Sequence, residues 1–131
     1  MNIEEVFKEV SDAIVLIDNF EVYYPLRIWG LKIIRQETMD TMKYALILDY
    51  LNFRSTTPLI SWLFGSEKGL SNINQIMSRL GDKNVLNNIG YGESLKDKSA
   101  RTLTYEVNKA FLEMLRIDFS KFDYIKEMLK D

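Results

Sequence analysis

The sequence predicts an all-α fold: a helical bundle of three long helices, with short helices in the middle and an amphipathic helix at the C-terminus. Apolar residues recur at intervals of three and four along most of the chain, which is the period of an amphipathic helix. We find no window of sustained apolar–polar alternation, and only two prolines interrupt the 131 residues. We expect a single α-helical domain over residues 1–131.

The first two predicted helices cover residues 3–18 and 26–51. The first has an apolar stripe followed by an end, 13–17, that is apolar all round, so we expect that end to be buried on two sides. Pro25 suits the first turn of the second helix. Gly30 costs on the order of 1 kcal/mol relative to alanine inside a helix, which indicates a kink or a close approach of another helix.

The middle of the chain predicts shorter elements. Thr57 and Pro58 begin a short apolar helix over 58–64. A fourth helix has its apolar stripe over 70–80 and ends at Gly81. A short helical turn follows over 82–89. We then expect a long helix over 94–117 and a last amphipathic helix over 120–130.

Neither cysteine nor histidine occurs in the chain. Their absence excludes thiolate and imidazole catalysis and the usual zinc sites, and leaves hard cations as the metals such a chain could hold well. Glu37 with Asp40, and Glu4 with Glu9, could pair around Mg²⁺, but both pairs fall on faces predicted to meet solvent. We therefore predict no catalytic residues, no cofactor and no metal. An enzyme remains an alternative only as a Mg²⁺-dependent carboxylate site.

Other motifs indicate little. Residues 90–94, Gly-Tyr-Gly-Glu-Ser, resemble a glycine-rich phosphate loop but lack its spacing, its preceding strand and its lysine. A helix stop followed by a capped helix start is the favoured interpretation. The longest apolar runs, 13–17 and 45–48, are far shorter than the roughly 20 residues of a membrane-spanning helix, so we expect no transmembrane segment.

Basic residues form two local clusters, although the net charge is −2. The clusters suggest nucleic-acid contact, and their members are Arg27, Lys32 and Arg35, and Lys96, Lys98 and Arg101. Against this, Asp97 lies between the first two cations of the second cluster, at the predicted start of a helix, which is the wrong end for stabilising cations. A solvent-exposed charged face is the favoured interpretation of both clusters.

Aromatic residues are abundant outside the long apolar stripes. A small bundle has limited room for so many large side chains, and subunit interfaces are rich in them. The candidate subunit interface comprises Phe20, Tyr23, Tyr24, Trp62, Phe64, Phe119, Phe122, Ile125 and Leu129. The alternative is that these side chains fill the ends of the bundle. We expect the helix over 120–130 to dock onto a neighbouring subunit.

In its length, helix order and isoleucine- and aromatic-rich segments, such as 33–34 and 119–125, the chain resembles the small all-helical major coat proteins of large tailed spindle-shaped archaeal viruses. That resemblance implies a structural, self-assembling capsid subunit in the virion, with itself as partner, and it transfers no individual residue. The alternative hypothesis is a cytoplasmic, nucleic-acid-binding helical subunit of a nucleoprotein complex, such as the small subunit of a CRISPR effector.

Overall fold

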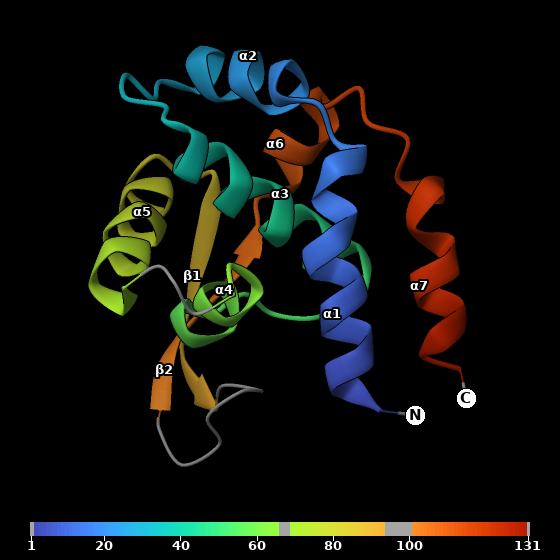
Figure 1. Ribbon diagram of the computed structural model, residues 1–131. Coiled ribbons are helices and arrows are strands. Elements are labelled where there is room, and N and C mark those ends of the chain that lie inside the picture. Colours follow the sequence, from blue (N-terminus) through green and yellow to red (C-terminus); the bar gives the residue numbers. More distant parts are fainter. Residues whose placement is uncertain (1, 66–68, 94–100, 131) are drawn as a thin grey trace.

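The computed structural model describes residues 2–65, 69–93 and 101–130. Its first half contains α1 (Ile3–Ala13), the 3-10 helix η1 (Ile14–Leu16), α2 (Asn19–Trp29), α3 (Gln36–Tyr50) and α4 (Thr57–Leu63). Its second half contains α5 (Leu70–Asp82), the strands β1 (Leu86–Glu93) and β2 (Arg101–Val107), α6 (Lys109–Met114), η2 (Phe119–Phe122) and α7 (Asp123–Met128). Figure 1 shows α3 in the middle, α5 at one edge and α7 at the other.

The all-α prediction was wrong, because β1 and β2 form a two-stranded antiparallel sheet in an otherwise mostly helical fold. Leu86 pairs with Val107 and Gly92 with Thr102, with an irregularity between Asn88 and Tyr91. The strand segments replace the predicted helical turn over 82–89 and part of the predicted helix over 94–117. The physical reason lies in residues 101–107, where threonine, tyrosine and valine favour a pleated strand, while glycine and asparagine in β1 disfavour a helix.

The predicted helix over 26–51 is also wrong, since two helices occupy this region. Helix α2 ends at Gly30, which adopts the left-handed conformation with φ of 112° and whose N–H donates to the carbonyls of Leu26 and Arg27. A side chain would be strained at this φ, so glycine allows the helix to end here. Residues 31–35 then form a non-helical segment before α3 begins. The first helix likewise ends at Ala13 and continues as η1.

The core is organised around α3. Every residue from Thr41 to Leu48 is buried, so this helix is covered on all sides. It packs against α1, α2, α4, α5 and β2. Lys43 is buried within this run, and its ammonium donates to Asn19 Oδ1 of α2 at 2.7 Å. The surrounding helices therefore present their outer sides to solvent while sharing one hydrophobic centre.

The hairpin is attached to the helices by main-chain hydrogen bonds. Ser55, between α3 and α4, exchanges two of them with Tyr105 of β2, at 3.0 and 2.9 Å. At the base of the hairpin, the Asn108 N–H donates to the Val85 carbonyl at 2.9 Å. The side chain of Tyr105 is buried. These contacts hold α4, α5 and the hairpin in one arrangement.

The C-terminal helix packs against its own chain. Phe122 and Ile125 are fully buried, and α7 lies beside α1 (Figure 1). The Tyr50 hydroxyl donates to Asp123, and the Lys126 ammonium lies 3.8 Å from the centre of the Tyr50 ring. Among the helices that the structure describes, none has the length and apolar content needed to span a membrane.

Candidate nucleic-acid interface

Helix α5 has two chemically distinct sides. Ile73, Ile76, Met77 and Leu80 recur at helical spacing and are buried in the core. The opposite side, which we call the α5 outer face, is exposed and carries Ser71, Asn72, Asn74, Gln75, Ser78, Arg79 and Asp82. Most of these side chains are uncharged amides and hydroxyls. The hydrophobic stripe therefore positions a polar, hydrogen-bonding surface on the outside of the molecule.

The outer face differs from an ordinary solvent-exposed helix surface, where oppositely charged side chains are usual. Amide side chains can form paired hydrogen bonds with the edge of adenine, and a guanidinium can do so with guanine. Hydroxyls bind either partner. The outer face thus has the donors and acceptors that base edges require, and few charges that would oppose their approach.

Two groups of side chains divide the outer face. Asn72 is held in place, because its Nδ2 donates to Glu37 Oε2 of α3 at 2.8 Å. Ser71, Gln75 and Arg79 follow one another at four-residue intervals, and their side chains have no hydrogen-bond partner in the described parts of the chain. Side chains with this spacing lie along one side of a helix. The outer face therefore presents a row of polar groups that a ligand can engage.

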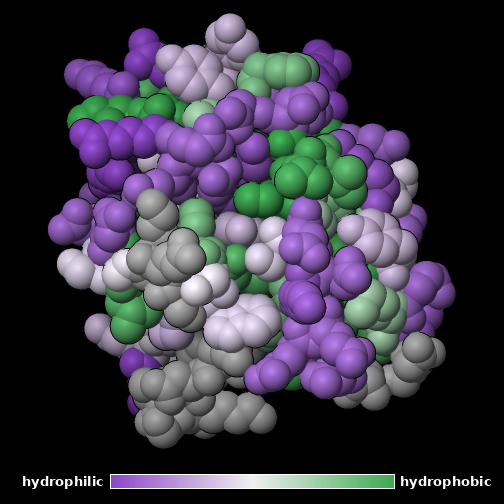
Figure 2. Space-filling model, in the orientation of Figure 1, coloured by the Kyte–Doolittle hydropathy of each residue, from purple (hydrophilic) through white to green (hydrophobic). Residues whose placement is uncertain are grey.

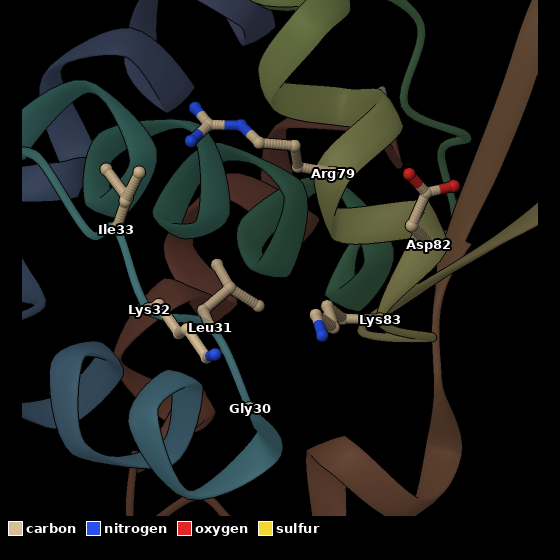
Figure 3. Close-up of a pocket in the computed structure, with 7 residues that line it drawn as sticks. All are labelled: Gly30, Leu31, Lys32, Ile33, Arg79, Asp82 and Lys83. Atoms are coloured by element: carbon tan, nitrogen blue, oxygen red, sulfur yellow. The ribbon is translucent and has the colours of Figure 1, made fainter.

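Arg79, the last member of this row, also belongs to a group of basic side chains at one side of the outer face. Arg35 and Arg79 line a depression of about 580 Å³ beside α5, and Lys32 and Lys83 line a neighbouring one of about 290 Å³. Figure 3 shows Arg79 extending from α5 toward Ile33, while Lys32 and Lys83 approach the gap from opposite elements. The 31–35 segment and the end of α5 together form a basic margin, which we define as Lys32, Arg35, Arg79 and Lys83.

Charge is unevenly distributed over the molecule. Residues 26–35 contain three cations and no carboxylate, whereas α1 contains four carboxylates and one lysine. The Arg27 guanidinium donates to the Lys32 carbonyl at 3.1 Å, and the Trp29 indole donates to the carbonyl of Lys83. These hydrogen bonds fix the 31–35 segment and tie it to the end of α5. The net charge of −2 therefore conceals a positive margin on one side of the protein.

The hairpin lies on the other side of the outer face, beside α5 (Figure 1). Burial raises the pKa of the Tyr105 phenol, and a hydrogen bond with Ser78 of α5 acts in the opposite direction. Arg101 is exposed at the start of β2, and Tyr91 is 67% exposed in β1. The predicted basic residues Lys96 and Lys98 fall in the connection between the strands, outside the described residues.

Helices α4 and α5 follow one another along the chain, as the two helices of a helix-turn-helix do, and the hairpin comes next. Helices α3, α4 and α5 pack against one another, and α4 begins with a Thr56 side chain that accepts the Leu59 N–H. Residues 64–69 join α4 to α5, a longer connection than the usual three or four residues. This length departs from the helix-turn-helix motif.

The predicted subunit-interface residues lie in several different places. Phe122 and Ile125 are buried inside the chain, Leu129 is half-buried, and Tyr23 packs against Tyr24. The rings of Trp62, Phe64 and Phe119 contact those of Phe7, Tyr44 and Tyr50, respectively. Phe20 and Tyr24 are more than half exposed, both on α2. The structure thus leaves α2 as the part of the predicted set that is open to a partner.

The remaining candidates do not form a site. Glu37 is hydrogen-bonded to Asn72, while Asp40 accepts from Gln36 and is 3.8 Å from the Lys43 ammonium. Within the described residues, no three acidic side chains are grouped as a metal site would require. The glycine-rich segment 90–92 lies in β1 and not at the end of a helix.

Sequence reasoning missed most of the α5 outer face. Arg79 and Lys83 were not among the predicted nucleic-acid contacts, and neither was Gln75. The signal was present in the polar positions between the apolar residues of α5, which are asparagine, glutamine and serine where lysine and glutamate are usual. The structure does bring Lys32 and Arg35, which were predicted, next to Arg79 and Lys83.

No family model, no curated protein and no solved structure matches the chain. The function must therefore be argued from the chemistry and geometry of the site itself.

Proposed function

We propose that the chain binds double-stranded DNA, with α5 in the major groove and basic side chains against the phosphates on either side. The observation that carries this proposal is the α5 outer face, a row made mostly of amides and hydroxyls beside the basic margin, with Arg79 belonging to both. A row of this kind matches the hydrogen-bonding edges of bases, and the cations match the backbone that flanks them.

The dimensions of α5 suit this role. Its 13 residues correspond to about 20 Å of helix, with a diameter of roughly 10–12 Å including side chains. The major groove of B-form DNA is about 12 Å wide and admits a helix. Because α5 lies at the edge of the molecule (Figure 1), one side of it can enter a groove while Ile76 and Met77 stay in the core.

The flanking elements would contact the backbone. Lys32 and Arg35 border α5, and Arg101 is exposed at the start of β2, in the hairpin that packs beside α5. Cations on both sides of a recognition helix position it over the groove and add affinity that does not depend on sequence. Duplex RNA is disfavoured, because its major groove is too narrow and deep for side chains to read.

The proposal is tested by fluorescence anisotropy with a labelled pool of random-sequence duplex DNA. Lys32→Ala combined with Lys83→Ala removes two proposed phosphate contacts, so the plot of log affinity against log salt should become shallower by about two. Lys130→Ala is the control, since this lysine is exposed just beyond the end of α7 and pairs with Glu127. Wild-type protein that does not bind duplex DNA at low salt, or that prefers duplex RNA, would contradict the proposal.

The coat-subunit hypothesis stays a prediction. It came with the expectation that the C-terminal helix docks onto a neighbour, whereas α7 packs on α1 of its own chain, with Phe122 and Ile125 buried. A shell also needs contacts that propagate beyond one symmetric pair. The feature that supports self-association is the exposed apolar surface of α2, which does not by itself extend an assembly.

A further inference from the structure

Helix α2 exposes a row of large apolar side chains. Phe20, Tyr24 and Ile28 follow at four-residue intervals and are 61%, 62% and 75% exposed. We call them the α2 stripe. The inner side of the same helix buries Val22 and Leu26 against the core, so the stripe points outward. Figure 2 shows apolar surface near the segment that joins α2 to α1, while the visible side of α2 itself is mixed in character.

The stripe belongs to an apolar patch at the upper end of the size range of monomer surfaces. With Val15 and Leu16, which are exposed just before α2, it presents about 600 Å² of side-chain surface, taking roughly 200 Å² for a fully exposed aromatic side chain. This equals the largest apolar patch of a typical monomer, about 300–600 Å². It also approaches the roughly 800 Å² that each partner contributes to a stable interface.

The same surface contains both protrusions and a place to receive them. A depression of about 310 Å³ lies between α2 and the end of α6, lined by the stripe together with Glu21, Pro25, Met114 and Arg116. It can accept an aromatic ring from a second surface. A patch that carries projecting rings and a matching depression is complementary to itself, which is the requirement for a two-fold interface.

The spacing of the stripe defines how two copies would pack. Side chains four residues apart form the ridge that interdigitates with its equivalent in the commonest class of helix packing, with the axes crossing at roughly −50°. A crossing centred on Tyr24 brings Phe20 of one chain beside Ile28 of the other. Two of the flanking charged side chains are hydrogen-bonded within each chain, because Glu21 accepts the Asp18 N–H and Arg27 donates to the Lys32 carbonyl. Glu21 and Arg116 both line the depression beside the stripe.

We propose that a second copy of this chain covers the α2 stripe, so that the protein is a two-fold dimer with Tyr24 close to the axis. This inference rests on the α2 surface alone and does not depend on nucleic-acid binding. It has a consequence for the α5 outer face, which lies on a different side of the molecule from α2 (Figure 1). A dimer leaves both outer faces uncovered and can therefore bring two of them to one partner.

The absence of cysteine provides a direct test by crosslinking. A Tyr24→Cys chain should form a disulfide-linked dimer under mild oxidation. A disulfide requires Cα atoms within about 7 Å. When the axes of two packed helices are about 8–10 Å apart, Cα atoms on their facing sides are closer together than the axes and meet this requirement. Tyr124→Cys is the matched control, since this tyrosine is also exposed but lies on α7. Crosslinking at Tyr24 that is no faster than at Tyr124 would overturn the proposal.

Sedimentation equilibrium measures the same interface without a new thiol. The wild-type protein should have twice the 15.4 kDa mass of the chain, and Tyr24→Glu combined with Ile28→Glu should reduce it to one chain. Both positions are exposed, so circular dichroism should show that the fold is retained. Tyr124→Glu should remain dimeric. A monomeric wild-type protein at about 100 µM, a concentration that saturates micromolar association, would contradict the dimer.

Discussion

Helices α2 and α5 have similar buried sides but chemically opposite exposed sides. Each buries one side, through Val22 and Leu26 in α2 and through Ile73 and Met77 in α5. The outer side of α2 is apolar and aromatic, whereas that of α5 is polar and nearly uncharged. Apolar surface gains free energy when another apolar surface removes it from water. Amides and a guanidinium gain specificity from a partner that offers matching hydrogen bonds.

The comparison shows that the inner face of each helix determines its position in the core, while the outer face is available for binding. The inner faces of α2 and α5 explain where each helix sits, and either could be replaced by another apolar set of the same size. The outer faces make no contribution to the core. They therefore predict distinct partners: a second protein chain for α2 and a nucleic acid for α5.

Removing the buried Tyr105 side chain, which packs beside α5, should have the largest effect on stability. Tyr105→Ala deletes a buried ring beside Ser78 and next to Gly81, and should lower the free energy of unfolding by about 3–5 kcal/mol. Urea denaturation measures this change. Tyr91→Ala, at an exposed tyrosine in the paired strand, should change stability by less than about 0.5 kcal/mol. Equal losses at the two positions would show that the hairpin is not anchored through Tyr105.

Salt concentration should affect DNA binding through α5 much more strongly than dimerisation through α2. The basic margin and Arg101 together provide five proposed phosphate contacts. With five contacts, raising salt from about 50 to 200 mM should weaken DNA binding by a factor of several hundred. Dimerisation through the apolar α2 stripe should change by only a few-fold, because it buries no new ion pair. Anisotropy and sedimentation, measured over the same salt series, provide the two values. DNA affinity that is insensitive to salt would contradict the role of the basic margin.

A smaller effect should distinguish base contacts from phosphate contacts. Gln75→Ala should cost about 1–3 kcal/mol on a preferred sequence selected from a random pool, and much less on unselected DNA, while the salt slope is unchanged. Binding measured with both duplexes provides the comparison. The same loss on both would indicate that Gln75 contributes to affinity without reading sequence.

The smallest expected effect concerns the base of the hairpin. Burial raises the pKa of Asp49 above its usual 3.8, although its Oδ1 accepts the Val107 N–H at 3.3 Å. The folded state therefore binds this proton more tightly, and the stability it contributes is lost as pH rises through the raised pKa. Asp49→Asn keeps an acceptor oxygen and should stabilise the protein at neutral pH by under about 1 kcal/mol, since water screens a half-buried group. Urea denaturation at neutral and acidic pH measures it, and a destabilised variant at neutral pH would show that the charge itself is needed.

Much of the helical part could be predicted from the sequence. The apolar stripes of α1 and α5 have a clear helical period, and Thr56, Thr57 and Pro58 mark the start of α4 within one residue. Gly30 was identified as a weak point, but the sequence does not show that α2 ends there, because Leu31 and Ile34 continue the apolar pattern. A left-handed glycine overrides a periodicity that would otherwise join the two helices.

The hairpin could not be identified by periodicity alone. Leu103, Tyr105 and Val107 alternate with polar residues over only a few positions, and Leu103, Val107 and Phe111 also fit helical spacing. Tertiary pairing with Ser55 and Val85 decides between these readings. The candidate site was missed for a related reason: the α5 outer face and the 31–35 segment are about 40 residues apart in sequence, and the fold alone brings them together.

The most direct test of the central claim is a two-dimensional ¹H–¹⁵N NMR titration of the labelled protein with a short DNA duplex. The account predicts that amide shifts concentrate on α5 between Ser71 and Lys83, on residues 31–35 and on the start of β2. Helices α1 and α7 should be unaffected. Shifts confined to α1 and α7, or none at low salt, would contradict the assignment of the α5 outer face as a nucleic-acid interface.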